Sequence, residues 1–210
     1  VFVVGGYYFQ AEGLRTAAAG TSAFLTCAGT LLAAFFAWPM LGQRPTRLLT
    51  AGILLAMLGS ALLSLRGEGF HLGHGELLTL LGSAMYAMQI VVLSRVARTA
   101  DPLVLVFAQS VVVAVTLLPF AHGAGAAFAA LDVDGWLRFA YLAVAGSTLA
   151  PILQVSAQGT LPAGRVALLF ALEPVFALLF AITLGGERFE ARWWAGAALI
   201  LSAVAMVEWR

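Results

Sequence analysis

Charge is scarce in this chain. Asp, Glu, Lys and Arg together make up 10% of its 210 residues, against about 25% in a typical soluble domain. Lysine is absent, and the formal net charge is only +1, so no basic surface for a nucleic-acid partner is expected. With 62% hydrophobic residues and a mean hydropathy of +0.98, the composition indicates an integral membrane protein of a lipid bilayer.

Residue types that carry catalysis or bind metals are also few. The single cysteine, Cys27, lies in an apolar run, which excludes an internal disulfide and a cysteine metal cage. His71, His74 and Glu76 lie in or beside a Gly-rich loop with no fourth ligand at a fixed spacing, which favours a solvated loop over a metal site. No phosphate-binding loop, G-x-S-x-G or H-E-x-x-H motif occurs in the sequence. The chain is therefore not expected to be an enzyme, and no cofactor is expected.

Long apolar runs are what the sequence does contain. A span across the hydrocarbon core takes about 20 apolar residues, and in lipid all backbone hydrogen bonds must be made internally. The sequence therefore predicts an all-α, polytopic membrane helical bundle. Its eight predicted helices cover about 1–16, 20–42, 47–65, 76–97, 102–121, 136–159, 163–185 and 190–208. A Gly- and Ala-rich stretch, 123–134, is predicted to be a surface loop.

The sequence also repeats itself. When the chain is shifted by 144 residues, 15 of the 52 positions from 10 to 61 are identical, among them Gln10 and Gln154. About five identities are expected by chance in spans built from so few residue types. The shift places helix 20–42 on helix 163–185, which comes five helices later. Because five is odd, the two copies enter the membrane from opposite sides, as in the inverted repeats of many secondary transporters.

The repeat predicts the domain organisation. Residues 1–65 hold three helices of a first copy, residues 66–75 form a connecting loop, and residues 76–210 hold the five helices of a second copy. If the copies are equal, shifting the start of the second copy back by 144 residues gives position −68. About 70 residues, or two helices, are then expected to precede residue 1, and ten helices are expected in total.

Three stretches of the second copy carry a family resemblance: Leu172–Ala177 (LEPVFA), Gly186–Arg188 (GER) and Gly196–Leu201 (GAALIL). With them the chain resembles the EamA-like family of the drug/metabolite transporter superfamily. The resemblance implies a carrier with a central cavity between the repeats, in the cell inner (plasma) membrane, with a cytoplasmic C-terminus. It also implies transport of amino acids, other metabolites or drugs, often by export. The first copy has Thr30 where the second has Pro174, which argues against a symmetric kink.

Glu173 is the sharpest candidate for a functional residue. A carboxylate at membrane depth is costly and normally faces a cavity or a partner, so Glu173 is expected to bind a proton or a charged group of the solute. The alternative is an acid near a helix end that caps the helix or snorkels. Pro174 removes a backbone donor and is expected to kink the helix. The alternative for Pro174 is a proline that packing tolerates.

Polar side chains on the other spans are candidates for lining a solute path. Tyr86 and Gln89 are three residues apart and Gln154 and Gln158 are four apart, so each pair shares one helix face. Such faces either line a cavity or join helices by hydrogen bonds. The expected substrate-binding residues are Gln10, Tyr86, Gln89, Gln109, Gln154, Gln158 and Glu173. Among the glutamines Gln10 and Gln154 are favoured, because the repeat relates their positions.

Together these patterns predict a secondary membrane transporter of small organic metabolites or drugs. It would work by alternating access about a central cavity between inverted repeats. Export is the direction that the family resemblance implies, and proton coupling through Glu173 is a further hypothesis. A non-transporting membrane scaffold is the alternative. The sequence leaves the oligomeric state open, a homodimer included.

Overall fold

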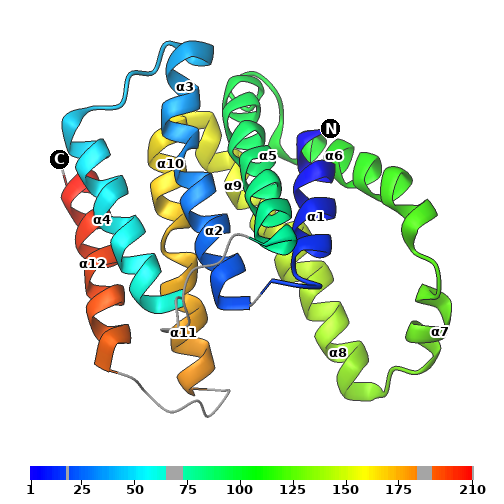
Figure 1. The fold of residues 1–210 in the computed structure, drawn as a ribbon. Coiled ribbons are helices and arrows are strands. Elements are labelled where there is room, and N and C mark those ends of the chain that lie inside the picture. Colours follow the sequence, from blue (N-terminus) through cyan, green and yellow to red (C-terminus); the bar gives the residue numbers. More distant parts are fainter. Residues whose placement is uncertain (18, 65–72, 184–190, 210) are drawn as a thin grey trace.

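The computed structural model of the chain describes residues 1–17, 19–64, 73–183 and 191–209. Within these ranges the regular structure is helical throughout, without a strand, which confirms the predicted all-α class (Figure 1). The elements are α1 (Phe2–Gly13), α2 (Ala19–Leu31), α3 (Ala33–Leu41), α4 (Arg47–Ser64), α5 (His74–Val96), α6 (Pro102–Leu117), the 3₁₀ turn η1 (Leu118–Phe120), α7 (Ala124–Ala129), α8 (Val133–Tyr141), the π-helix η2 (Leu142–Leu149), α9 (Ala150–Thr160), α10 (Ala163–Phe170), α11 (Glu173–Thr183) and α12 (Ala191–Glu208).

Several of these helices are long and apolar enough to cross a membrane. Among the described residues six stretches qualify: Thr21–Leu41, Arg47–Ser64, His74–Val96, Pro102–Phe120, Val133–Thr160 and Ala163–Phe180. They match six of the predicted spans to within a few residues and confirm a polytopic membrane bundle. The predicted spans 1–16 and 190–208 correspond to α1 and α12, which are helical but lie outside this set of six. The total helix number stays a prediction.

One predicted loop differs from the structure, and a second lies mostly outside the described residues. The stretch 123–134 is not loop throughout, because α7 forms inside it and Phe128 stacks on Trp136 at 5.9 Å between ring centroids. Stacked aromatic side chains bury apolar area, and this contact fixes α7 against α8. Most of the loop 66–75, including His71, lies outside the described residues, and α5 begins at His74. Within the described ranges no group of three His, Cys, Asp or Glu could hold a metal ion.

Small residues allow a close backbone contact between α4 and α12. α4 packs along α12, and their backbones approach most closely at Gly59 and Gly196. A Cβ atom at Gly59 would lie 2.6 Å from the Gly196 carbonyl oxygen, and one at Gly196 would lie 2.7 Å from that of Gly59. Without an oil–water difference between helices in lipid, such close backbone packing is a main source of association energy.

The helix arrangement agrees with the inverted repeat. A shift of 144 residues carries the bounds of α4 onto 191–208, which are the bounds of α12. In Figure 1, α2–α3 and α10–α11 run through the bundle in opposite directions. The contact of Gly59 with Gly196 also has a counterpart, because the same shift relates it to the contact of Gly52 with Ala203. The repeat and its domain boundaries remain an interpretation that these relations support.

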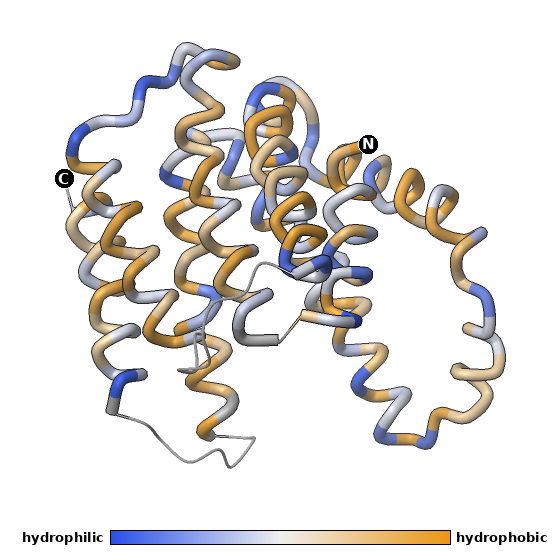
Figure 2. The backbone as a smooth tube through the Cα atoms, viewed as in Figure 1, coloured by the Kyte–Doolittle hydropathy of each residue, from blue (hydrophilic) through white to orange (hydrophobic). Residues whose placement is uncertain are grey.

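On one side of the molecule, few residues are covered by other parts of the chain. In the spans Pro102–Phe120 and Val133–Thr160 only 6% of residues are buried inside the chain, against 33–44% in the other four spans. Figure 1 shows α6, α7 and α8 extending to one side of the bundle, and Figure 2 shows mostly hydrophobic residues along α6 and a mixture of hydrophobic and hydrophilic residues along α8. Side chains such as Phe107, Val115 and Leu137 are exposed there, as suits contact with lipid hydrocarbon.

Candidate functional site

Three helices bring a chain of polar side chains together near the middle of α5. The Tyr86 hydroxyl of α5 donates to Gln10 Oε1 of α1 at 2.9 Å. Gln10 Nε2 in turn donates to Thr26 Oγ1 of α2 at 3.4 Å. These residues are 16 to 76 positions apart in sequence, so only the folded bundle places them in one network. With Glu173, described next, we call them the central cluster.

Glu173 is the acidic member of the central cluster. It is the first residue of α11, and its carboxylate is close enough to Tyr86 and Cys27 to interact electrostatically with both. It is exposed, and within the described ranges it forms no ion pair. Tyr86 and Cys27, with which it interacts, belong to α5 and α2. The start of α11 also favours a carboxylate through the helix dipole, so the capping alternative stays open.

Glycine makes room for the central cluster. A Cβ atom at Gly6 would lie 2.5 Å from Cε1 of Tyr86, so the tyrosine ring can reach its place only because Gly6 has no side chain. Tyr7 packs edge-on against the same ring, with 5.9 Å between the centroids. Tyr7 is a site neighbour that the sequence analysis missed. The adjacent glycine pair, Gly5 and Gly6, was the signal that could have indicated a close approach in α1.

The helix containing Glu173 is interrupted directly before it. Ala171 and Leu172 separate α10 from α11, and their amides donate to carbonyls three residues back, Leu168 and Leu169, at 3.0 Å each. Pro174 has no N–H with which to continue the α-helical ladder to Phe170. The interruption therefore lies where the sequence predicts a kink.

The first copy is interrupted as well, contrary to the expectation from Thr30. The break lies at Leu32, whose amide donates to Gly29 at 3.1 Å, and no proline is involved. Thr30 Oγ1 donates to the Cys27 carbonyl at 2.8 Å. A threonine that bonds back to its own helix competes with the backbone ladder and often bends it. The helix break in the first copy thus lies near a threonine hydroxyl bonded to the backbone, whereas the break in the second copy lies beside a proline.

The other predicted site residues lie elsewhere in the bundle. Gln89 Nε2 donates to Gln109 Oε1 at 3.0 Å and joins α5 to α6. Gln158 is fully buried, and its Nε2 donates to the Ile90 carbonyl at 3.4 Å, as the helix-packing alternative requires. Gln154 is half-buried and makes no hydrogen bond to another described residue. Of the seven predicted residues, the structure joins Gln10 to Tyr86 and Gln89 to Gln109 by hydrogen bonds, and it places Glu173 within electrostatic range of Tyr86.

Comparison with known proteins agrees with this architecture. Residues 1–65 and 73–209 match the model of the EamA-like transporter family. The chain is 29% identical over 205 residues to an uncharacterized transporter of Archaeoglobus fulgidus, covering 98% of this chain and 65% of that protein's length. A crystal structure of a protein with 19% identity superposes with a TM-score of 0.81, over 98% of this chain and 72% of that one. At this identity the superposition shows a shared fold.

Proposed function

Because the chain belongs to the EamA-like transporter family, we propose that it forms the core of a secondary transporter for small organic solutes. The family is a transporter family and not an enzymatic one, in agreement with the sequence analysis. Six candidate spans make the chain a multi-pass membrane protein. The solute, the direction of transport and the coupling are part of the proposal. The family resemblance favours export of metabolites or drugs.

The observation that carries the proposal is the central cluster. Polar and ionisable side chains inside a membrane bundle are costly and tend to mark solute or ion paths. Gln10 and Tyr86 supply both donors and acceptors, and Glu173 supplies a carboxylate without a salt-bridge partner in the described chain. A polar solute could exchange its water for these groups at little net cost. A helix that is broken near its middle, as at α10–α11, is also typical of transporter binding sites.

A mechanism follows from this arrangement. The two helix pairs α2–α3 and α10–α11 would rock against each other, so that the central cluster faces first one side of the membrane and then the other. Glu173 would bind either a proton or a cationic group of the solute. Because both cannot occupy one carboxylate, proton entry would drive solute exit. This coupling is antiport, and it makes the transport rate depend on pH.

The substitution Glu173→Gln tests the coupling. We expect full-length protein in proteoliposomes to exchange solute at a rate that depends on pH. The solutes are first identified by comparing metabolite efflux from cells with and without the overproduced protein. Glu173→Gln keeps the side-chain shape but cannot release a proton, so the pH dependence should disappear. Asp134→Asn removes a carboxylate from exposed α8 and should leave the pH profile unchanged.

Two outcomes would count against the proposal. A Glu173→Gln variant with an intact pH profile removes proton coupling through this residue. If no solute moves, and none raises the thermal midpoint of the purified protein, the scaffold alternative gains instead, since a ligand that binds only the folded state must raise apparent stability.

A further inference from the structure

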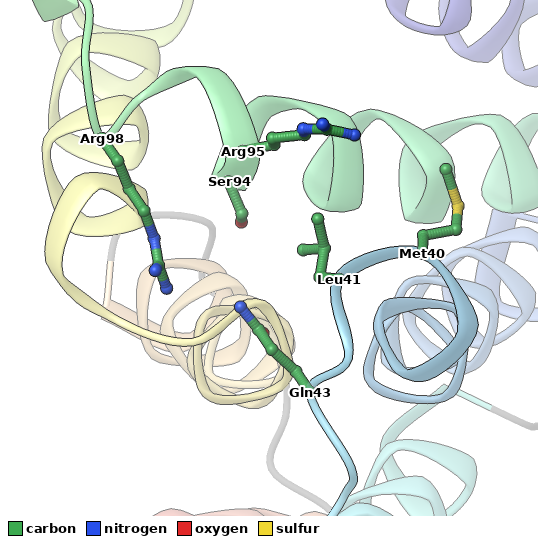
Figure 3. Close-up of a pocket in the computed structure, with 6 residues that line it drawn as sticks. All are labelled: Met40, Leu41, Gln43, Ser94, Arg95 and Arg98. Atoms are coloured by element: carbon green, nitrogen blue, oxygen red, sulfur yellow. The ribbon is translucent and has the colours of Figure 1, made fainter.

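A second polar site lies at the end of the bundle where α3 and α5 finish and α10 begins. A cavity of about 340 Å³ opens there, apart from the central cluster. It is lined by Met40, Leu41, Gln43, Ser94, Arg95 and Arg98, which we call the arginine pocket (Figure 3). None of these residues was a predicted substrate-binding residue, and the family resemblance assigned them no role.

The buried hydroxyl of Ser94 is the first sign that the arginine pocket is a binding site. Ser94 is 1% exposed, and its Oγ has no hydrogen-bond partner among the described residues. Buried hydroxyls in proteins are nearly always paired, so an orphan needs an explanation. In Figure 3 the Ser94 side chain points into the space that Arg98 and Gln43 also face. A ligand in that space would supply the missing partner.

The other polar groups of the arginine pocket are donors. Gln43 Oε1 already accepts from the Ala163 N–H at 3.0 Å, which leaves the amide nitrogen of Gln43 for the cavity. Arg95 and Arg98 form no ion pair with any carboxylate of the described chain. The Arg98 guanidinium, the Gln43 amide nitrogen and the Ser94 hydroxyl therefore face one space, while the Arg95 side chain extends along α5 toward Met40 (Figure 3). No lining side chain carries a negative charge.

We propose that the arginine pocket binds an oxyanion of the phosphate type. Guanidinium groups present paired N–H donors that match phosphate oxygens, and such charge-assisted bonds are about twice as strong as neutral ones. Two sources share this chemistry: the headgroup of an anionic phospholipid and a free phosphate or phosphate ester. The pocket lies where α3 and α5 end, and basic sites at the ends of membrane helices can bind lipid headgroups. Met40 and Leu41 supply apolar surface beside the donors.

The test compares two sources of phosphate on the purified chain. In the first arm the chain is placed in phosphatidylcholine nanodiscs, and inorganic phosphate is titrated while the thermal midpoint is followed. In the second arm phosphatidylglycerol replaces a part of the lipid and no phosphate is added. A saturable rise in the first arm identifies a free anion, and a rise confined to the second identifies a lipid headgroup. No rise in either arm overturns the proposal. Because the readout is binding, failure of the transport proposal would leave this result untouched.

Three variants separate the arginine pocket from general effects of charge. Arg98→Gln removes a charged donor and should weaken the apparent affinity about tenfold. Arg47→Gln removes the same charge from the exposed start of α4 at the same end of the bundle, outside the pocket, and should change nothing. Ser94→Ala removes a buried unpaired hydroxyl, so it should leave the unliganded midpoint unchanged or raise it, and it should weaken binding by about threefold or more.

Equal losses in Arg98→Gln and Arg47→Gln would overturn the proposal, because they would show a non-specific response to ions. If Arg98→Gln does not fold, Ser94→Ala decides. An unchanged affinity in Ser94→Ala then contradicts a ligand that contacts this hydroxyl.

Discussion

Gln158 illustrates how burial separates a structural amide from a site residue. Its side chain is fully buried between α9 and α5, its Nε2 is paired with the Ile90 carbonyl, and its Oε1 has no partner in the described chain. A buried acceptor without a donor costs about 1–3 kcal/mol, while one hydrogen bond between membrane helices contributes about 0.6 kcal/mol. We therefore predict that Gln158→Leu leaves the thermal midpoint unchanged or raises it, by up to about 1 kcal/mol in unfolding free energy.

The same variant distinguishes the two roles that the sequence left open for Gln158. If the amide only packs helices, full-length Gln158→Leu keeps its transport rate. A lost rate with an unchanged midpoint would instead place Gln158 on the solute path. Gln154→Leu, one turn earlier on α9 and only half-buried, is the matched control for the thermal midpoint, because it adds the same apolar side chain without removing a buried acceptor.

Polar residues could be chosen from the sequence, but their partners could not. A glutamine or an acid inside an apolar span is costly, and this cost is why Gln10, Tyr86 and Glu173 could be selected as candidate site residues. Their role in binding a solute stays a prediction. The bond from Tyr86 to Gln10 joins residues 76 positions apart. The arginine pocket was missed because Arg98 and Gln43 lie near helix ends, where polar residues are ordinary.

The junction of α10 and α11 is the element on which the proposed mechanism most depends. Pro174 is the second residue of α11, where the backbone N–H of a helix has no intrahelical partner in any case. Pro174→Ala would restore a donor facing the Phe170 carbonyl, and α10 and α11 could then fuse into one helix. We predict that the separation between Arg165 and Thr183 rises toward about 27 Å, which is the rise of a straight helix over the 18 steps between these residues at 1.5 Å each.

Spin labels at Arg165→Cys and Thr183→Cys, in a Cys27→Ala background, measure this distance. Leu178→Ala, which alters α11 without supplying a donor at the junction, serves as the control and should not lengthen the distance. An unchanged separation in Pro174→Ala would show that packing, and not the proline, maintains the break. The break at Leu32 forms without a proline at the junction, so an unchanged separation is a possible outcome of this test.

Helix positions were well predicted and helix details were not. The rule of about 20 apolar residues located the spans because lipid leaves the backbone no alternative to a helix. The π-helix η2 lies inside a span that was expected to be regular, and there Thr148 Oγ1 donates to the Ala143 carbonyl five residues back. A hydrogen bond of this kind does not change the hydropathy pattern, so the π-helix could not be predicted from it. α7 was missed for a related reason, since its aromatic contacts with α8 are tertiary.

The two proposed repeats are related by their helix contacts as well as by their sequences. Gly59 contacts Gly196, and the 144-residue shift turns this pair into Ala203 and Gly52, which also approach each other. A contact pattern that maps onto itself in this way is what a two-fold relation between two similar units produces. The pairing of α4 with α12 therefore joins the two proposed repeats near their shared axis.

This pairing gives a graded prediction for the whole molecule. A Cβ at Gly59 or Gly196 would lie 2.6–2.7 Å from a carbonyl oxygen of the facing helix, which cannot move away without separating α4 from α12. A Cβ at Gly52 would meet chiefly the Val207 side chain at 2.8 Å, which can rotate, while the Ala203 oxygen is 3.4 Å away. We predict that Gly59→Ala and Gly196→Ala each cost about 1–3 kcal/mol, and that Gly52→Ala costs less.

The order of the thermal midpoints is the measurement, with Gly125→Ala as the control. A Cβ at Gly125 meets nothing within 4 Å, so this variant reports only the general gain in helix propensity of about 1 kcal/mol. If Gly59→Ala and Gly196→Ala match Gly125→Ala, the backbones of α4 and α12 do not approach as closely as described. Loss at only one of the two glycines would contradict the reciprocal contact, because each added methyl group meets the other residue's carbonyl. If α4 and α12 are joined as one inverted pair, Gly59→Ala and Gly196→Ala must therefore lower the thermal midpoint by similar amounts.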